Sequence, residues 1–157
     1  LDGTVLRLSN GLGTPVRKNV DCWTLVVNEL CRQAVENRRI ILNSSRRIER
    51  DFFPISMLVK AILSIINHDV IEDSIINVSS SKTITLEDIT NLVCDRANAI
   101  LGFRPDVIYK NDVVSNYNNK LSISNDLLGK YAMLEIDVRD EIDGLLLDCK
   151  KWFGPPE

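Results

Sequence analysis

Short runs of β-branched and apolar residues alternate with longer amphipathic stretches along this 157-residue chain. Residues 4–9 and 39–42 have the composition of strands. Residues 21–37 instead repeat apolar side chains at intervals of three and four, which places them on one face of a helix. Strand patterns separated by helical patterns are typical of an α/β protein rather than of a helical bundle or a β-sandwich. We therefore predict an α/β fold.

Three more segments carry strand patterns, and these are residues 48–53, 74–78 and 106–109. The polar residues 43–45 lie between the strands predicted at 39–42 and 48–53, so we expect these two strands to form a hairpin. Residues 111–126 are polar and rich in asparagine. They predict a loop with at most one edge strand, at residues 121–123.

Three further helices are predicted, over residues 56–66, 85–101 and 138–153. Ser56 is the expected N-cap of the first, whose strongly apolar sequence predicts heavy burial. Thr85 and Asp88 have the spacing of a reciprocal cap at the start of the second, and Gly102 follows its end as an expected C-cap.

Neither a metal site nor a generic catalytic signature is found in the sequence. His68 is the only histidine, and the four cysteines lack metal-ligand spacing, which argues against zinc. The cysteines fall in apolar helical patterns and are expected to be buried free thiols in a reducing cytoplasm rather than disulfides or nucleophiles. There is no glycine-rich dinucleotide turn, P-loop or nucleophile elbow. We assign no catalytic residue.

The basic residues are concentrated near the start of the chain. The first 50 residues carry nine basic side chains against five acidic ones, whereas the whole chain has a net charge of −3. A basic first third of the chain in an otherwise acidic protein suits a compact anion such as a diphosphate better than a nucleic acid. For each of these basic residues taken singly, a solvated position on the surface is an equally good explanation. The most apolar stretch, residues 55–66, contains Lys60 and is too short to span a bilayer. We predict a cytoplasmic protein.

Two polar residues, one at the end of a predicted strand and one in a strand that leads into a helix, are candidates for binding a ligand. Asn10 follows the strand predicted at residues 4–9, and the carboxyl ends of strands are where α/β sheets bind ligands. Arg50 lies in the strand that leads into the helix after Pro54. An amide can donate to a phosphate oxygen and a guanidinium can bind it through two bonds. Taken singly, Asn10 is more often a turn residue and Arg50 more often half of a surface ion pair.

Three segments together match the motifs of a known family. Residues 6–13 (LRLSNGLG) resemble its LR-x-x-N-x-x-G strand and loop, and residues 50–55 (RDFFPI) resemble its R-D-F/Y-I-H-V segment. Residues 75–85 (IINVSSSKTIT) are similar to its N-V-G-x-G strand-to-helix junction. The order is that of the extended short-chain dehydrogenase/reductase family, the NAD-dependent epimerases and dehydratases of nucleotide sugars.

The resemblance implies that residues 1–157 are the carboxy-terminal part of such an enzyme. This part comprises the last strands of a Rossmann-type parallel sheet plus the smaller α/β substrate-binding domain, without the amino-terminal nucleotide-binding half. It implies that Asn10 and Arg50 contact the diphosphate of a nucleotide sugar, and that Leu8 and Ser9 lie near the nicotinamide. NAD or NADP would bind the full-length parent rather than this chain alone, and the parent could form a homodimer.

The departures from the family pattern bear on activity. Pro54 stands where the family usually has His or Tyr, and Ser79 and Ser81 replace the glycines of the third motif. The family's Y-x-x-x-K pair, whose lysine lowers the pKa of the tyrosine, is absent, since Tyr117 precedes Lys120 by only three positions. We therefore expect this chain to be the substrate-binding portion of an NAD(P)-dependent nucleotide-sugar epimerase, dehydratase or reductase. This portion is expected to be inactive by itself. The alternative is a non-catalytic sugar-nucleotide-binding or protein-interaction module.

Overall fold

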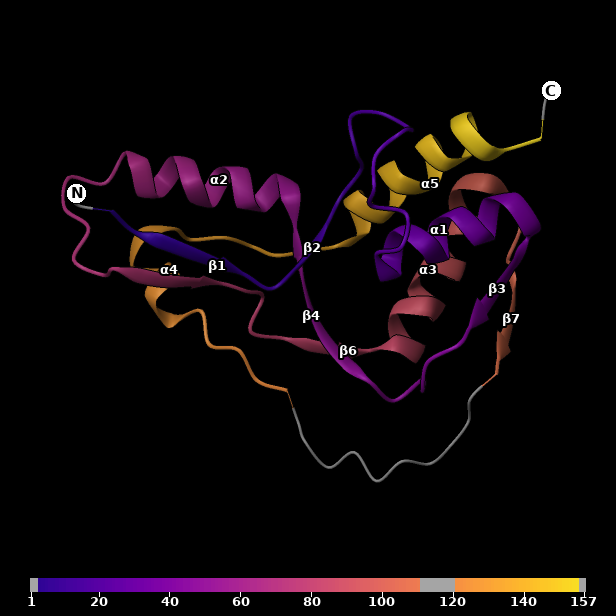
Figure 1. Ribbon diagram of the computed structural model, residues 1–157, viewed down its shortest axis with the longest axis horizontal. Coiled ribbons are helices and arrows are strands. Elements are labelled where there is room, and N and C mark those ends of the chain that lie inside the picture. Colours follow the sequence, from indigo (N-terminus) through magenta and orange to yellow (C-terminus); the bar gives the residue numbers. More distant parts are fainter. Residues whose placement is uncertain (1–2, 111–120, 156–157) are drawn as a thin grey trace.

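The computed structural model describes residues 3–110 and 121–155 (Figure 1). Short strands alternate with helices along the chain, as predicted. The strands are β1 (Val5–Leu8), β2 (Asn10–Leu12), β3 (Arg39–Leu42), β4 (Glu49–Pro54), β5 (Ile75–Val78), β6 (Thr83–Thr85) and β7 (Asp106–Tyr109). The helices are α1 (Val26–Asn37), α2 (Ile55–Ile66), α3 (Leu86–Leu101), α4 (Asp126–Tyr131) and α5 (Arg139–Phe153).

The strands form three small sheets, ordered β1-β5, β2-β4-β6 and β3-β7. The pairs β1–β5, β2–β4 and β3–β7 are parallel, and β4–β6 is antiparallel. Because β3 and β4 lie in different sheets, the hairpin predicted for them is wrong. Parallel pairing with β7 instead lets β3 bury Ile40 and Leu42 beneath α1.

Two hydrophobic clusters lie on either side of the β2-β4-β6 sheet (Figure 1). The larger cluster is formed mainly by α1, α3 and α5, which pack on one another and cover β3 and β7. The smaller cluster lies between α2, α4 and the β1-β5 sheet. Strands β2 and β4 run between the two clusters, and neighbouring residues of β4 belong to different ones, Phe52 to the larger cluster and Phe53 to the smaller.

Most helix ends follow the local sequence. Thr85 caps α3 by accepting from the Asp88 N–H at 3.0 Å, and Gly102 ends that helix with a φ of 77°, as predicted. Helix α1 begins at Val26 rather than at residue 21, because residues 21–24 form turns. Ser56 is not the N-cap of α2, because the helix begins one residue earlier, at Ile55. The Ser56 N–H instead donates to Glu141 Oε1 of α5 at 2.9 Å.

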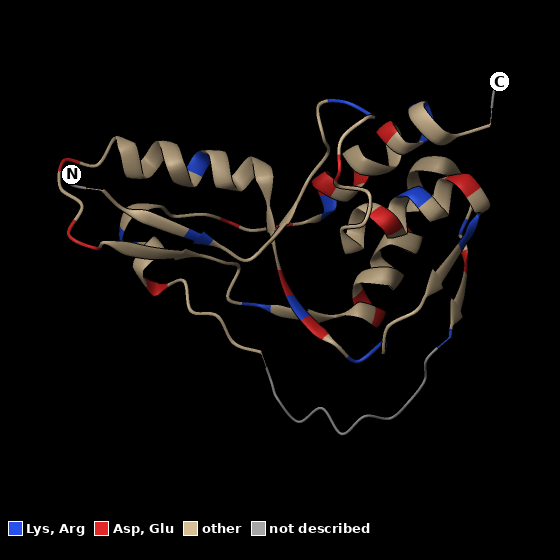
Figure 2. Ribbon diagram, viewed as in Figure 1, with Lys and Arg blue, Asp and Glu red and all other residues tan. Residues whose placement is uncertain are grey.

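Helix α2 is much less buried than its sequence suggested. Only Ala61 and Ile65 are buried, whereas Val59, Leu63 and Ile66 are 51–70% exposed. The two-stranded β1-β5 sheet is narrow and covers only part of the circumference of the helix. Figure 2 shows how few charges this part of the molecule carries, since Lys60 is the only charged residue of α2. A largely apolar face of α2 is therefore open to solvent.

Three short elements were not predicted. Strands β2 and β6 have three residues each and α4 has six, which is too few for a periodic pattern. The edge strand expected at residues 121–123 does not form, and most of the expected loop lies outside the described residues. None of the described helices combines the length and the hydropathy required to cross a membrane.

Candidate functional site

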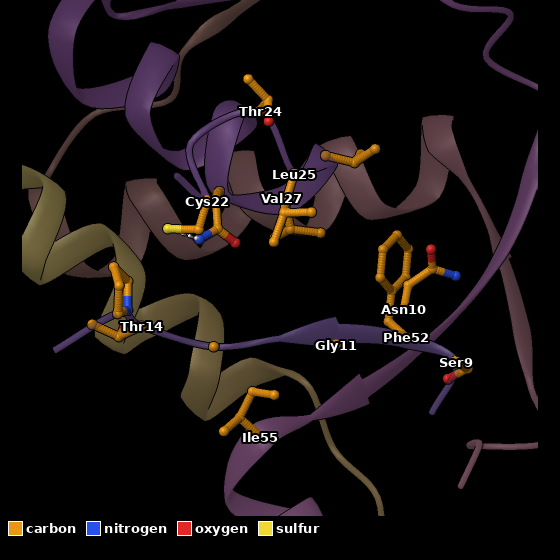
Figure 3. Close-up of a pocket in the computed structure, with 14 residues that line it drawn as sticks. Ser9, Asn10, Gly11, Thr14, Cys22, Thr24, Leu25, Val27, Phe52 and Ile55 are labelled. Carbon is orange, nitrogen blue, oxygen red and sulfur yellow. Dashed lines mark hydrogen bonds between the residues drawn. The ribbon is translucent and has the colours of Figure 1, made fainter. Parts of the chain in front are cut away.

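A pocket of about 560 Å³ lies between β2 and the amino-terminal end of α1 (Figure 3). One wall is the chain as it leaves β1, and the opposite wall is the first turn of α1 with the residues before it. Phe52 of β4 and Ile55 of α2 also line it. The remaining lining residues are Ser9, Asn10, Gly11, Gly13, Thr14, Pro15, Cys22, Thr24, Leu25, Val26, Val27 and Asn28.

The position of Ser9 and Asn10 follows from a change of sheet. Strand β1 pairs with β5, and after Ser9 the chain continues as β2, which pairs with β4. Both residues therefore lie at the carboxyl end of a parallel strand, where α/β sheets bind ligands. Asn10 is exposed and Ser9 is half-buried, and both residues line the pocket. Leu8 is 39% exposed and its side chain lies against Gly11.

A fully buried carboxylate, Asp51, holds this junction together. Its Oδ1 accepts from the Ser9 hydroxyl at 2.6 Å and from the Ser80 N–H at 2.9 Å, and its Oδ2 accepts from the Ser80 hydroxyl at 2.9 Å. Its backbone carbonyl accepts from Asn10 Nδ2 at 2.8 Å. Asp51 thus orients both Ser9 and Asn10, a role that has no local signal in the sequence.

Arg50 and Asn10 lie on the same face of the β2–β4 pair. Asn10 lies directly opposite Phe52 in the register, and Arg50 shares the face of Phe52 because side chains alternate along a strand. Arg50 is thus about 7 Å further along this face. It does not line the pocket itself, and its Nη1 donates to the Glu49 carbonyl at 3.0 Å.

The electrostatics of the pocket come from its backbone, because none of its lining residues is charged. Leu25 provides no side-chain cap for α1, and the first intrahelical bond is from the Glu29 N–H to the Leu25 carbonyl at 2.8 Å. The N–H groups of Val26, Val27 and Asn28 therefore precede that bond, at the positive end of the helix. This arrangement can bind an anion.

The thiol in the pocket is not set up as a nucleophile. Burial raises the pKa of the Cys22 thiol, while a hydrogen bond from Asn28 opposes that shift and the nearby Asp21 adds to it. All four cysteines are free, and burial also raises the pKa of Cys31, of Cys94 and, to about 12, of Cys149. At neutral pH these side chains are protonated thiols.

Gly13 is held closely against α2, and an added methyl group has no room there. A Cβ at this position would lie 2.9 Å from both Cβ and Cγ1 of Ile55. We expect Gly13→Ala to lower the free energy of unfolding by about 1 to 3 kcal/mol, measured by urea denaturation. The control is Gly129→Ala in α4, where a Cβ meets nothing within 4 Å and helix propensity favours alanine. Equal stability of the two variants would contradict this prediction.

A scan against models of known protein families finds no match to the sequence, and a search of curated proteins finds none either. Solved structures do share the fold. RMD from Pseudomonas aeruginosa, complexed with NADPH, matches with a TM-score of 0.71 and 16% identity over 94% of this chain and 48% of that one. UDP-glucose 4-epimerase from Thermotoga maritima, with UDP-glucose, matches with a TM-score of 0.68 and 15% identity over 94% and 46%.

A third similar structure is UDP-glucuronic acid 4-epimerase from Bacillus cereus, in complex with UDP-glucuronic acid and NAD. Its TM-score is 0.67, with 14% identity over 94% of this chain and 45% of that one. The chain therefore spans about half the length of the structures it matches. Its mixed α/β fold with parallel strands is shared with about half of each of these structures.

Proposed function

We propose that this chain is the substrate-binding portion of an NAD(P)-dependent nucleotide-sugar epimerase, dehydratase or reductase. The observation that carries this proposal is the pocket in which Asn10, the first residue of β2, faces the first turn of α1. The fold shared with nucleotide-sugar epimerases supports the same function. The chain holds the nucleotide diphosphate, and its parent supplies the catalytic residues.

The diphosphate is bound by donors from three segments. One N–H of the Asn10 amide donates to the Asp51 carbonyl, and the second, which has no acceptor within residues 3–110 and 121–155, donates to a phosphate oxygen. The first-turn N–H groups of α1 face it across the pocket. Arg50, on the same face as Asn10, supplies the positive charge that the pocket lining lacks.

The smaller cluster supports a parent with a larger sheet. Strand β1 pairs only with β5 among the described residues, so its other edge carries unpaired backbone groups. Val5 of β1 and Ile75, its register partner in β5, are about half exposed. Two-stranded parallel sheets are rarely stable alone, and parallel sheets are normally covered on both faces. We therefore assign residues 1–157 to the carboxy-terminal part of the parent, with the strands of a nucleotide-binding half continuing beyond β1.

The proposed neighbours of the nicotinamide are Leu8 and Ser9. Leu8 offers an exposed apolar surface and Ser9 a polar group beside it, so these two residues would lie against the ring of NAD or NADP in the parent. The bound cofactor supplies hydride transfer. Within this chain, Asn10 and Arg50 hold the diphosphate so that the sugar faces that ring. A homodimer of the parent stays a prediction.

Calorimetric titration of the chain with UDP-, dTDP- and GDP-glucose tests the proposed function. We expect saturable binding of at least one of the three, competed by the matching nucleoside diphosphate and not by free glucose, because the diphosphate provides the charged contacts. Free glucose is the control for nonspecific sugar binding. The absence of saturable heat with all three nucleotide sugars at millimolar concentration would reject the proposal.

A further inference from the structure

The chain between β2 and α1 forms a long loop, residues 13–25, without helix or strand. Connections in compact domains typically have about 4 to 6 residues, and much longer ones commonly serve a function. Figure 3 shows part of this loop on one side of the pocket. The loop residues that line the pocket are Gly13, Thr14, Pro15, Cys22, Thr24 and Leu25. One wall of the pocket is therefore made of a segment that no regular element fixes.

The hydrogen bonds inside this loop are local. The Cys22 N–H donates to the Val20 carbonyl at 3.0 Å, and the Leu25 N–H donates to the Cys22 carbonyl at 3.1 Å. The indole N–H of Trp23 reaches the Lys18 carbonyl at 2.8 Å. Bonds over so few residues shape the loop but do not attach it to the rest of the molecule. Its attachment therefore rests on side-chain contacts with other elements.

The loop is attached to the carboxy-terminal end of α5, which lies beside it (Figure 1). The ring of Trp23 meets the rings of Trp152 and Phe153 edge to face, with centroids 5.8 and 5.0 Å away. Lys18 Nζ donates to the Trp152 carbonyl at 2.6 Å and lies 4.6 Å from the centre of the Phe153 ring. A cation at this place complements the negative end of the helix. We call Trp23, Trp152 and Phe153 the aromatic cluster.

Trp23 acts on the pocket from outside it. Its two neighbours in sequence, Cys22 and Thr24, line the pocket, whereas Trp23, Trp152 and Phe153 do not. Trp23 is instead partly buried against the larger hydrophobic cluster. A displacement of its ring would therefore move the pocket residues on both sides of it, although the ring itself does not reach a ligand.

We propose that Trp23 is a positioning residue for the nucleotide sugar, because its packing on the end of α5 holds the pocket wall of residues 22–25 in the shape that binds. The inference rests on the proposed function, since it assumes that a nucleotide sugar occupies the pocket. A wall that is formed before binding need not be ordered at the expense of affinity. Without the aromatic cluster, only a fraction of the molecules presents this wall, and the dissociation constant rises by the inverse of that fraction.

The test is calorimetric titration of UDP-glucose into the unmodified chain, Trp23→Leu and Phe153→Leu. We expect each variant to bind about 5- to 20-fold more weakly, as a wall formed in roughly one molecule in ten would give. The double variant should bind no more weakly than either single one, because both substitutions remove the same packing. Phe103→Leu is the matched control and should bind unchanged, since this partly buried ring packs on Arg38 at the other end of α1.

Tryptophan fluorescence separates positioning from a purely structural role. Trp23 and Trp152 are the only two tryptophans of the chain, so its emission reports on the aromatic cluster. We expect the emission of Phe153→Leu to lie at longer wavelength than that of the unmodified chain. Saturating UDP-glucose should reverse this shift, because a ligand that binds better to the formed wall stabilises it to the same extent.

Two results would overturn the role of Trp23 and leave the proposed function standing. One is a folded Trp23→Leu that binds UDP-glucose as tightly as the unmodified chain, whatever its melting temperature. The other is an emission of Phe153→Leu that saturating ligand leaves unchanged. Failure of the unmodified chain to bind UDP-glucose overturns both proposals. If Trp23→Leu does not fold, Phe153→Leu removes the same packing from the α5 side and replaces it in the titration.

Discussion

Asp51→Ala is expected to lower the free energy of unfolding by about 3 to 5 kcal/mol, as for other buried charged groups that lose a partner network. The substitution leaves the Ser9 hydroxyl and the Ser80 N–H without their acceptor in a partly buried site, whereas the Ser80 hydroxyl still has the Lys82 carbonyl at 2.8 Å. Each buried donor left unpaired costs about 1 to 3 kcal/mol. Urea denaturation followed by circular dichroism measures the loss.

Asp51→Asn is the matched control, because its side-chain oxygen still accepts from Ser9 and from the Ser80 N–H. Its new amide N–H groups can donate to the Ser80 hydroxyl. We expect this variant to lose about 1 kcal/mol. If Asp51→Ala is no less stable than Asp51→Asn, the carboxylate does not hold the β1–β2 junction together.

Arg50→Ala is expected to weaken binding of UDP-glucose by about 10- to 100-fold, since a charge-assisted bond to phosphate contributes roughly 1.5 to 3 kcal/mol. Stability should change little, because Arg50 is only partly buried and bonds to a neighbouring carbonyl. Calorimetric titration at constant ionic strength provides the two dissociation constants.

Arg47→Ala is the control for a general loss of positive charge, because Arg47 is exposed in the turn before β4. Its effect on binding should be small and should vanish at high salt, where exposed charges are screened. Arg50→Lys keeps the charge but loses bidentate geometry and should bind between the alanine variant and the unmodified chain. Unchanged binding by Arg50→Ala would mean that Arg50 is not the diphosphate anchor.

Long periodic segments could be predicted from sequence, whereas burial could not. Helices α3 and α5 repeat their apolar residues over four turns, and the Thr85 cap and Gly102 end are set by adjacent residues. The α2 sequence is just as regular, yet half of its apolar face is exposed. How much of a helix is covered depends on the width of the sheet beside it, which is a property of distant segments.

Some residues of the candidate site could also be predicted from the sequence, and others could not. Asn10 could be found because a strand pattern ends beside it, and its neighbour Ser9 follows from that. Asp51 bonds to residues 42 and 29 positions away, so its role has no local signal. The helix end at the pocket was placed wrongly, because α1 begins at Val26, five residues after the apolar pattern starts.

Within the part of the chain that the structure describes, one edge of β1 is unpaired. An unpaired strand edge flanked by apolar side chains is a template on which a second copy can add, and so it promotes aggregation. Arg7 is the one charged residue of β1 and is exposed, which places it as a gatekeeper against such pairing. Solubility is therefore expected to fall if Arg7 is neutralised, and a concentrated sample should benefit from keeping that charge.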